Sequence, residues 1–361
     1  MDRSPLRTPS RSRRKGFFVS AILAAALVGG ACTAGGTAAP STSAPTQPPP
    51  SAAAPTLSPT ASPSPTATQP PFPLTIQDDE GTQVTLPAVP QRIVSLTPAS
   101  TEELFALGEG SRLVGDTDSD DYPAAAKALP HVATFQGVIM EQVVAARPDL
   151  VIAGGDGFTH PADIARMRAL GIPVVVIYAP TVAAVLADLR LVGEATGALP
   201  AATAMTTEMQ RRMDAIAALA AAEPVHPTVF YEIGVGPDIY APADDSFVAD
   251  MVTRAGGVPI TTGDPNSYTI SLEKLVQADP AVIVLGDYDY GTTVADVVAR
   301  PGWEHLQAVV DGAVRPVDDT IVTRPGPRLA DGLAALALAI DPNLVLPADL
   351  LPAATPAPSP S

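Results

Sequence analysis

One long helical stretch, residues 200–222, most constrains the fold, because it separates two regions that share one pattern. On both sides of it, short apolar runs rich in Val and Ile alternate with helical stretches, which is typical of parallel βα units. Pro200 suits a first helical turn, and at 1.5 Å per residue the stretch would extend about 35 Å. The predicted fold class is α/β, with two Rossmann-like lobes joined by a single long backbone helix and a ligand cleft between the lobes.

The boundaries of the lobes follow from these patterns. The N-terminal lobe is expected over residues 72–180, the helical linker with the backbone helix over 181–222 and the C-terminal lobe over 223–345. The first lobe begins with a hairpin at 74–87 that turns at Gly81, a residue free to adopt positive φ. Because ligands of such sheets bind beyond the carboxyl ends of the strands, the loops that follow the strands are the candidate binding loops.

The N-terminal segment predicts export. Residues 1–31 combine a basic start, an apolar stretch of about a dozen residues and small residues, which is typical of a signal peptide. Cys32, the only cysteine, follows directly and is predicted to be lipidated, although Gly29 stands where a lipobox usually has Leu. Ordinary secretion with a free thiol is the alternative. Residues 32–71 are rich in Pro, Ser, Thr and Ala and predict an extended tether, and residues 346–361 predict a flexible tail.

The charge of the chain excludes one class of partner. The formal net charge is −17, and removal of the basic leader makes the mature chain more acidic still. Binding of nucleic acid depends on Lys and Arg, so we expect no nucleic-acid partner. The chain suits an exported domain that is a monomer.

The stretch DTDSDDYP, residues 116–123, places four carboxylates within six residues. As an EF-hand loop it would need Gly and Glu where Asp121 and Lys127 stand. The four His residues are scattered, and no phosphate-binding or nucleophile-elbow motif is present. We therefore expect no enzyme activity and no cofactor, with an exported metal-dependent enzyme as the alternative from another class. The remaining interpretation is a ligand-binding loop at the end of a strand.

Several segments, taken in order, resemble a known family. They are RIVSLTPASTEELFALG, LVGDTDSDDYP, ATFQGVIMEQVVAARPDLVIAGG, TISLEKLVQADPAVIVLGD and TRPGPRLADGL, within residues 74–340. Together they resemble the iron–siderophore and cobalamin binding proteins of ABC importers, the helical-backbone type, and most of all the cobalamin-binding members. The resemblance implies two α/β lobes joined by one backbone helix and delivery of a captured ligand to a membrane permease.

The resemblance also implies two docking residues. In this family a surface Glu on each lobe meets Arg residues of the permease, and the matching positions here are Glu141 and Glu273. Independently of the family, a Glu in the first turn of a helix is stabilised by the helix dipole. Simple helix capping by these two residues is the alternative.

For the ligand, the resemblance implies aromatic rings from both lobes. Phe135 stands where cobalamin-binding members carry Trp, and Ser119 where they often carry Tyr. Large rings with a polar group suit a flat macrocycle, and Arg324 could pair with a ligand carboxylate or with Asp120 or Asp121. The candidate ligand-binding residues are Asp120, Asp121, Tyr122, Phe135, Gln136, Tyr231, Tyr240, Trp303 and Arg324.

The sequence therefore predicts a lipid-anchored extracytoplasmic substrate-binding protein that captures a cobalamin-like corrinoid. Ferric siderophore or haem is the alternative within the same fold, with Tyr231 or Tyr240 as a possible iron ligand. A sensor lipoprotein without a transport role is a further alternative. The expected partners are the permease subunits, through Glu141 and Glu273, the small-molecule ligand, and the membrane, through Cys32.

Overall fold

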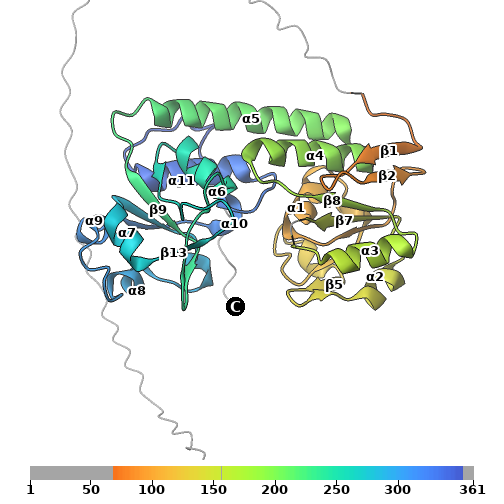
Figure 1. Ribbon diagram of the computed structural model, residues 1–361. Helices are drawn as coiled ribbons and strands as arrows, with labels where there is room; N and C mark the ends of the chain where they lie inside the picture. The colour runs from red at the N-terminus through yellow and green to blue at the C-terminus, as the bar shows by residue number, and fades with distance from the viewer. Residues whose placement is uncertain (1–67, 156, 353–361) are drawn as a thin grey trace, which may run out of the picture. The chain divides into compact units, whose positions relative to one another are not determined.

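A computed structural model describes residues 68–155 and 157–352, which belong to one compact unit running from Ser62 to Ser361. The predicted signal peptide, Cys32 and most of the predicted tether lie outside the described residues. The architecture is α/β, with two separate parallel sheets and helices packed on them (Figure 1). This confirms the predicted fold class.

The N-terminal lobe is built on a six-stranded sheet of order β6-β5-β4-β3-β7-β8. All neighbours run parallel except β5 and β6, which form a short antiparallel pair. The central strands are buried along their whole length, as strands covered on both faces should be. The strands are β3 (Ile93–Ser95), β4 (Leu113–Thr117), β5 (His131–Thr134), β6 (Gly137–Val138), β7 (Leu150–Gly154) and β8 (Val174–Ile177).

The helices of this lobe are α1 (Pro98–Ala106), α2 (Met140–Ala146) and α3 (Pro161–Ala169). Thr97 caps α1 by accepting from the Ser100 N–H, and His160 caps α3. The predicted hairpin is present as β1 (Leu74–Gln77) and β2 (Gln83–Leu86), with Gly81 at φ 78°. Arg168 of α3 ties the hairpin to the lobe through Asp78, with 2.7 Å between Nη2 and Oδ2.

The linker is a pair of packed helices rather than one isolated rod. Helix α4 (Val182–Thr196) ends at Gly197, and α5 (Leu199–Ala221) runs back along it (Figure 1). Close packing requires Gly193, where an added Cβ would lie 2.4 Å from the Cβ of Ala202. Ala202 packs with the N-terminal core, whereas Met209, Met213, Ile216 and Ala220 pack with the C-terminal core. Helix α5 is therefore shared by the cores of both lobes, as the prediction of a backbone helix requires.

The C-terminal lobe has a four-stranded parallel sheet of order β12-β9-β14-β15 and a small antiparallel sheet of order β10-β11-β13. The sequence reading missed the small sheet because its strands have only two residues each. The strands are β9 (Thr228–Glu232), β10 (Gly234–Val235), β11 (Ile239–Tyr240), β12 (Val258–Pro259), β13 (Thr269–Ile270), β14 (Val282–Leu285) and β15 (Val314–Pro316).

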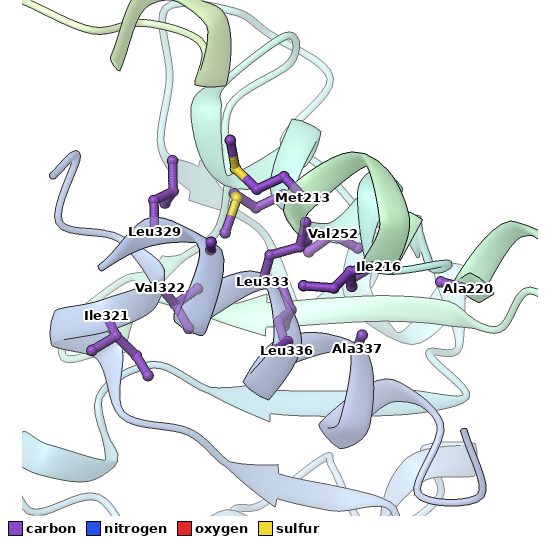
Figure 2. Packing of buried hydrophobic residues seen from close by; sticks show 14 of the residues in the cluster. Met213, Ile216, Ala220, Val252, Ile321, Val322, Leu329, Leu333, Leu336 and Ala337 are labelled. Atoms are coloured by element: carbon purple, nitrogen blue, oxygen red, sulfur yellow. The ribbon is translucent and has the colours of Figure 1, made fainter. Parts of the chain in front are cut away.

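Six helices complete this lobe, and the last is the most apolar of them. Helix α11 places Leu333, Leu336 and Ala337 against Met213 and Ile216 of the backbone helix (Figure 2). Residues Pro301 and Gly302 separate the two short helices α8 and α9, because proline cannot continue a helix. The helices are α6 (Phe247–Arg254), α7 (Leu272–Ala278), α8 (Val294–Val298), α9 (Gln307–Val310), α10 (Asp319–Val322) and α11 (Leu329–Ile340).

Two predicted boundaries are wrong by a few residues. The predicted tether reaches residue 71, but the side chain of Gln69 binds the backbone at Glu194 and Leu199, so the end of this segment is part of the lobe. The predicted flexible tail begins at residue 346, yet Leu346 and Leu350 are buried in the C-terminal core. Isolated Leu residues between prolines carry no periodicity, so the sequence could not show that they pack.

Among the described residues, no helix combines the length and the apolar character that crossing a membrane requires.

Candidate ligand-binding site

Exposed aromatic rings follow the strands of the N-terminal sheet. Tyr122 comes after β4 and is 38% exposed, Phe135 comes after β5 and is 99% exposed, and Phe158 comes after β7 and is also largely exposed. A single exposed ring is common, but several large rings gathered at one edge can mark a ligand-binding site. Because parallel strands share one carboxyl edge, these three rings belong to the same edge of the sheet.

The C-terminal lobe places further rings beyond its own strand ends. Tyr240 on β11 and Tyr268 before β13 are partly exposed, and so are Tyr288 and Tyr290 in the turn after β14. Burial raises the pKa of the Tyr290 phenol, with Asp319 contributing repulsion. Tyr290 therefore stays neutral near pH 7 and can donate a hydrogen bond.

Two predicted ligand contacts, Tyr231 and Trp303, are corrected by the structure. The ring of Tyr231 is fully buried against Gly286, where an added Cβ would lie 2.4 Å from the ring, and its hydroxyl donates to Asp319 Oδ1 at 2.8 Å. Trp303 is 3% exposed and packs edge-on against Phe230. Both rings pack in the core of the C-terminal lobe. Tyr231 is on β9, a strand covered on both faces, whereas Trp303 lies between α8 and α9.

Asp120 is also corrected. It is 4% exposed, and its Oδ2 accepts from the Thr117 N–H at 2.8 Å and from the Thr117 hydroxyl. Asp120 thus folds the loop back on the end of β4 instead of facing a ligand. Deeper in the strand, Asp116 pairs with His131 at 2.9 Å, and burial raises the pKa of Asp116 to about 6.

Asp121 and Arg324 lie together, as the sequence reading allowed. Asp121 Oδ1 accepts from Arg324 Nη1 at 2.8 Å, and the Asp121 side chain remains half exposed. The same Nη1 donates to Glu102 Oε1 at 2.7 Å. Arg328 adds two hydrogen bonds to Glu102, and its guanidinium lies 4.1 Å from the centre of the Tyr122 ring. These contacts join helix α1 and the DYP loop of the N-terminal lobe to the segment before α11.

Sequence reasoning missed Glu102, Arg328 and Phe158. Glu102 lies in a helix where a Glu usually faces water, and only the distant arginines explain its burial. Phe158 could have been found, because it follows a buried strand in the same way as Tyr122 and Phe135 do. Gln136 lies exposed beside Phe135, and its backbone N–H donates to the Thr134 hydroxyl.

The two predicted docking residues occupy matching places in the two lobes. Glu141 is exposed in the first turn of α2, and Glu273 is exposed in the first turn of α7. Both helices have seven residues and end in a left-handed residue, Arg147 or Asp279, before a Pro and a buried parallel strand. Glu141 lines an open surface depression of about 360 Å³ together with Met140, Val144, Arg166 and Leu170.

Within residues 68–155 and 157–352, no group of three or more His, Cys, Asp or Glu residues is placed to hold a metal ion. Three carboxylates of the DTDSDDYP stretch, those of Asp116, Asp120 and Asp121, instead bind His131, Thr117 and Arg324. The acidic stretch therefore shapes a loop and leaves Asp118 and Asp121 exposed.

The fold and the exposed rings define a class: a two-lobed binding protein with a helical backbone. A family model described as periplasmic binding protein matches residues 93–320. The chain belongs to this family, and it is a substrate-binding protein of the ABC-importer type.

Two curated relatives and one solved structure show the range of similar proteins. An uncharacterized ABC transporter substrate-binding lipoprotein of Bacillus subtilis, YvrC, is 33% identical over 276 residues, covering 75% of this chain and 87% of its own. A cobalamin-binding protein of Halobacterium salinarum is 30% identical over 276 residues, covering 74% and 73%. The structure of a periplasmic heme binding protein from Pseudomonas aeruginosa is 29% identical, with a TM-score of 0.62 over 71% of this chain and 94% of that one.

Proposed function

We propose that this protein captures a cobalamin-like corrinoid between its two lobes and delivers it to the permease of an ABC importer. The observation that carries the ligand proposal is the set of exposed rings beyond the strand ends, Tyr122, Phe135 and Tyr240 among them. A corrin is a broad, largely apolar plate with polar amides at its edge. Aromatic faces suit the plate, and the half-exposed Asp121 and the Gln136 amide suit the amide groups.

The names of several relatives support the proposal of a corrinoid ligand. Proteins named cobalamin-binding or vitamin B12-binding are among those that match most of the chain. Arg324, predicted to bind the ligand, shares its Nη1 between Glu102 and Asp121. We propose that Arg324 borders the ligand rather than holding it alone.

Spectroscopy of the full-length protein tests the ligand directly. The protein is incubated with cyanocobalamin, hemin or a ferric siderophore and freed of unbound ligand, and its absorbance spectrum is recorded. We expect retention of cyanocobalamin. Phe135→Ala should weaken binding about tenfold, by loss of a stacking ring, whereas Val310→Ala, an exposed apolar control on α9, should not. Retention of only hemin or siderophore would overturn the corrinoid proposal.

Haem is a second candidate because one of the two predicted iron ligands remains partly exposed. Tyr240 is partly exposed on β11, while Tyr231 is committed to Asp319. Heme-binding proteins are among the similar structures. A haem bound through Tyr240 would show a Soret band that shifts in Tyr240→Phe, and an unshifted band would remove Tyr240 from this role.

We propose Glu141 and Glu273 as the permease-docking residues. Each stands exposed at the same point of a seven-residue helix, and α2 adds a surface hollow beside Glu141. Reversal of both charges to Lys should abolish uptake into cells while the purified protein keeps its ligand affinity. Glu208→Lys, on the exposed face of α5, is the control. Unchanged uptake would favour a sensor without a transport role.

The anchor is proposed to be a lipid on Cys32, followed by the tether that begins there. The relative YvrC is named a lipoprotein, and a lipid-anchored protein would be extracytoplasmic. Cys32→Ser should release the protein from the membrane fraction into the medium or periplasm. Retention of the variant in the membrane fraction would contradict the proposal.

A further inference from the structure

Glu102 is a buried carboxylate whose ion-pair partners, over the described residues, both come from the other lobe. Its side chain is 2% exposed in helix α1. Arg328 donates from Nε to Oε2 at 2.7 Å and from Nη2 to Oε1 at 2.6 Å, and Arg324 donates from Nη1 to Oε1 at 2.7 Å. The separations in sequence are 222 and 226 residues. A buried charge without such partners would be strongly unfavourable, so the burial of Glu102 depends on the juxtaposition of the lobes.

The segment that supplies the arginines lies directly against α1. It runs Arg324-Pro-Gly-Pro-Arg328 between α10 and α11, and an added Cβ at Gly326 would lie 3.8 Å from the Ala99 carbonyl oxygen. Two prolines limit the backbone freedom of this segment. The arginines therefore approach Glu102 from a restrained backbone, which reduces the entropy lost on forming the contacts.

The same two arginines also hold the DYP loop. Arg324 reaches Asp121 at 2.8 Å, and the Arg328 guanidinium lies over the Tyr122 ring at 4.1 Å. We call Glu102, Asp121, Arg324 and Arg328 the inter-lobe clasp. Its two guanidinium groups balance its two carboxylates, so no charge of the clasp is left over. One face of Tyr122 is covered by Arg328, while the ring as a whole stays 38% exposed.

We propose that Glu102 and Arg328 are positioning residues for ligand binding. They do not touch the ligand. They hold Asp121 and Tyr122 in place and fix the position of one lobe relative to the other, so that the ligand-binding residues are already ordered in the unliganded protein. This inference rests on the proposed function for its ligand readout, but the positioning itself can be measured without a ligand. Preorganisation of this kind raises affinity by lowering the ordering cost of binding.

The test uses Glu102→Gln in the full-length protein. Gln keeps the shape of the side chain but removes the charge that both arginines share. Amide hydrogen exchange should become about tenfold faster or more in residues 117–122 and in the Arg324–Arg328 segment, because local opening no longer breaks the ion pairs. Glu208→Gln, which removes a Glu–Arg pair exposed on α5, is the matched control and should leave exchange in both segments unchanged.

A second readout separates positioning from general stability. Cyanocobalamin affinity, measured well below the melting temperature, should fall about tenfold in Glu102→Gln, with Arg328→Lys intermediate because it keeps the charge but not the paired hydrogen bonds. Unchanged exchange in residues 117–122 would overturn the proposal, and so would a lower melting temperature with full affinity. If the wild-type protein does not bind cyanocobalamin, the corrinoid proposal fails while the exchange result still decides the role of the clasp.

Discussion

Glu102 and Glu103 are neighbours in helix α1 and both are buried, yet their surroundings are opposite. Glu102 faces the inter-lobe clasp and is matched by Arg324 and Arg328. Glu103 lies near two other acids, the exposed Asp79 and the buried Asp188, and we call these three residues the acid cluster. Neither oxygen of Glu103 has a hydrogen-bond partner among the described residues. A helix rotates about 100° per residue, so adjacent residues meet different elements.

The difference shows two ways in which a protein tolerates a buried carboxyl group. Around Glu102 the charge is kept and two cations compensate it. Around Glu103, burial, Asp188, Glu102 and Asp79 together raise the pKa well above its usual value, so the group stays protonated and uncharged. Burial, repulsion by Asp79 and a hydrogen bond to Asp79 likewise raise the pKa of Asp188 to about 8. The charged arrangement joins the two lobes, whereas the neutral one joins helix α1 and the hairpin turn of the N-terminal lobe to the linker helix α4.

The largest expected effect comes from removing an arginine that pairs with Glu102. Arg328→Met removes two of the three hydrogen bonds to Glu102 and leaves a buried carboxylate only partly matched. Unfolding by urea should show a loss of about 3 kcal/mol. Arg315→Met is the control, because the Arg315 guanidinium binds the Gly312 carbonyl in an exposed contact. A loss no larger than that of the control would mean that the clasp contributes little.

The next effect is the dependence of stability on pH through Asp188. In the folded protein Asp188 keeps its proton up to about pH 8, whereas in the unfolded chain it loses it near 3.8. This contribution to stability is full below about pH 4 and is lost as the pH rises toward 8, with a slope approaching about 1.4 kcal/mol per pH unit. Urea unfolding of Asp188→Asn between pH 5 and 8 should show a flatter profile. A profile as steep as that of the wild type would contradict the assignment.

A smaller effect is expected from Glu103→Gln, the counterpart of Glu102→Gln. Because Glu103 is already neutral, an amide of the same shape should change the free energy of unfolding by about 1 kcal/mol or less at pH 5. As the pH rises, the free energy of unfolding of the variant should increase relative to that of the wild type, because the amide has no proton to lose. If Glu103→Gln destabilised the protein as much as Glu102→Gln at pH 5, the two sites would not differ in charge state.

The smallest effect should come from the exposed pair Glu208–Arg211 on helix α5, whose side chains are each more than half exposed. Water and salt screen such a pair, and its formation restricts two long side chains. Glu208→Gln should leave the melting temperature unchanged within error at 0.15 M and at 1 M salt. A clear fall in the melting temperature at 0.15 M salt would contradict this expectation, because it would show that exposed ion pairs on α5 stabilise the protein substantially.

The sequence predicted the two lobes and the backbone helix because these depend on local patterns. Alternating Val-rich strands, the Pro200 start of a helix and the Gly stops are all visible within short windows. The hairpin turn at Gly81 was confirmed for the same reason. The short strands β10, β11 and β13 were missed, since two residues carry no period that could be recognised.

For the candidate site, the sequence located the loops but not the direction of each side chain. Tyr122, Phe135 and Tyr240 are exposed where the strands end, whereas Tyr231 and Trp303 face the core. Nothing local distinguishes these two groups, because an aromatic residue is compatible with either place. The sequence offered the pairing of Asp121 with Arg324 as one alternative. It did not predict the hydrogen bond between the Asp120 carboxylate and the Thr117 N–H.

By itself the sequence determined the longer strands and helices, the division into two lobes joined by a backbone helix, and which loops follow the strands. These properties depend on periodicity and on the backbone preferences of Pro and Gly, which act over a few residues. Only the tertiary structure decided that Glu102 keeps its charge and Glu103 does not. That choice depends on whether arginines more than 200 residues away reach the same face of one helix, and no local pattern encodes such a meeting.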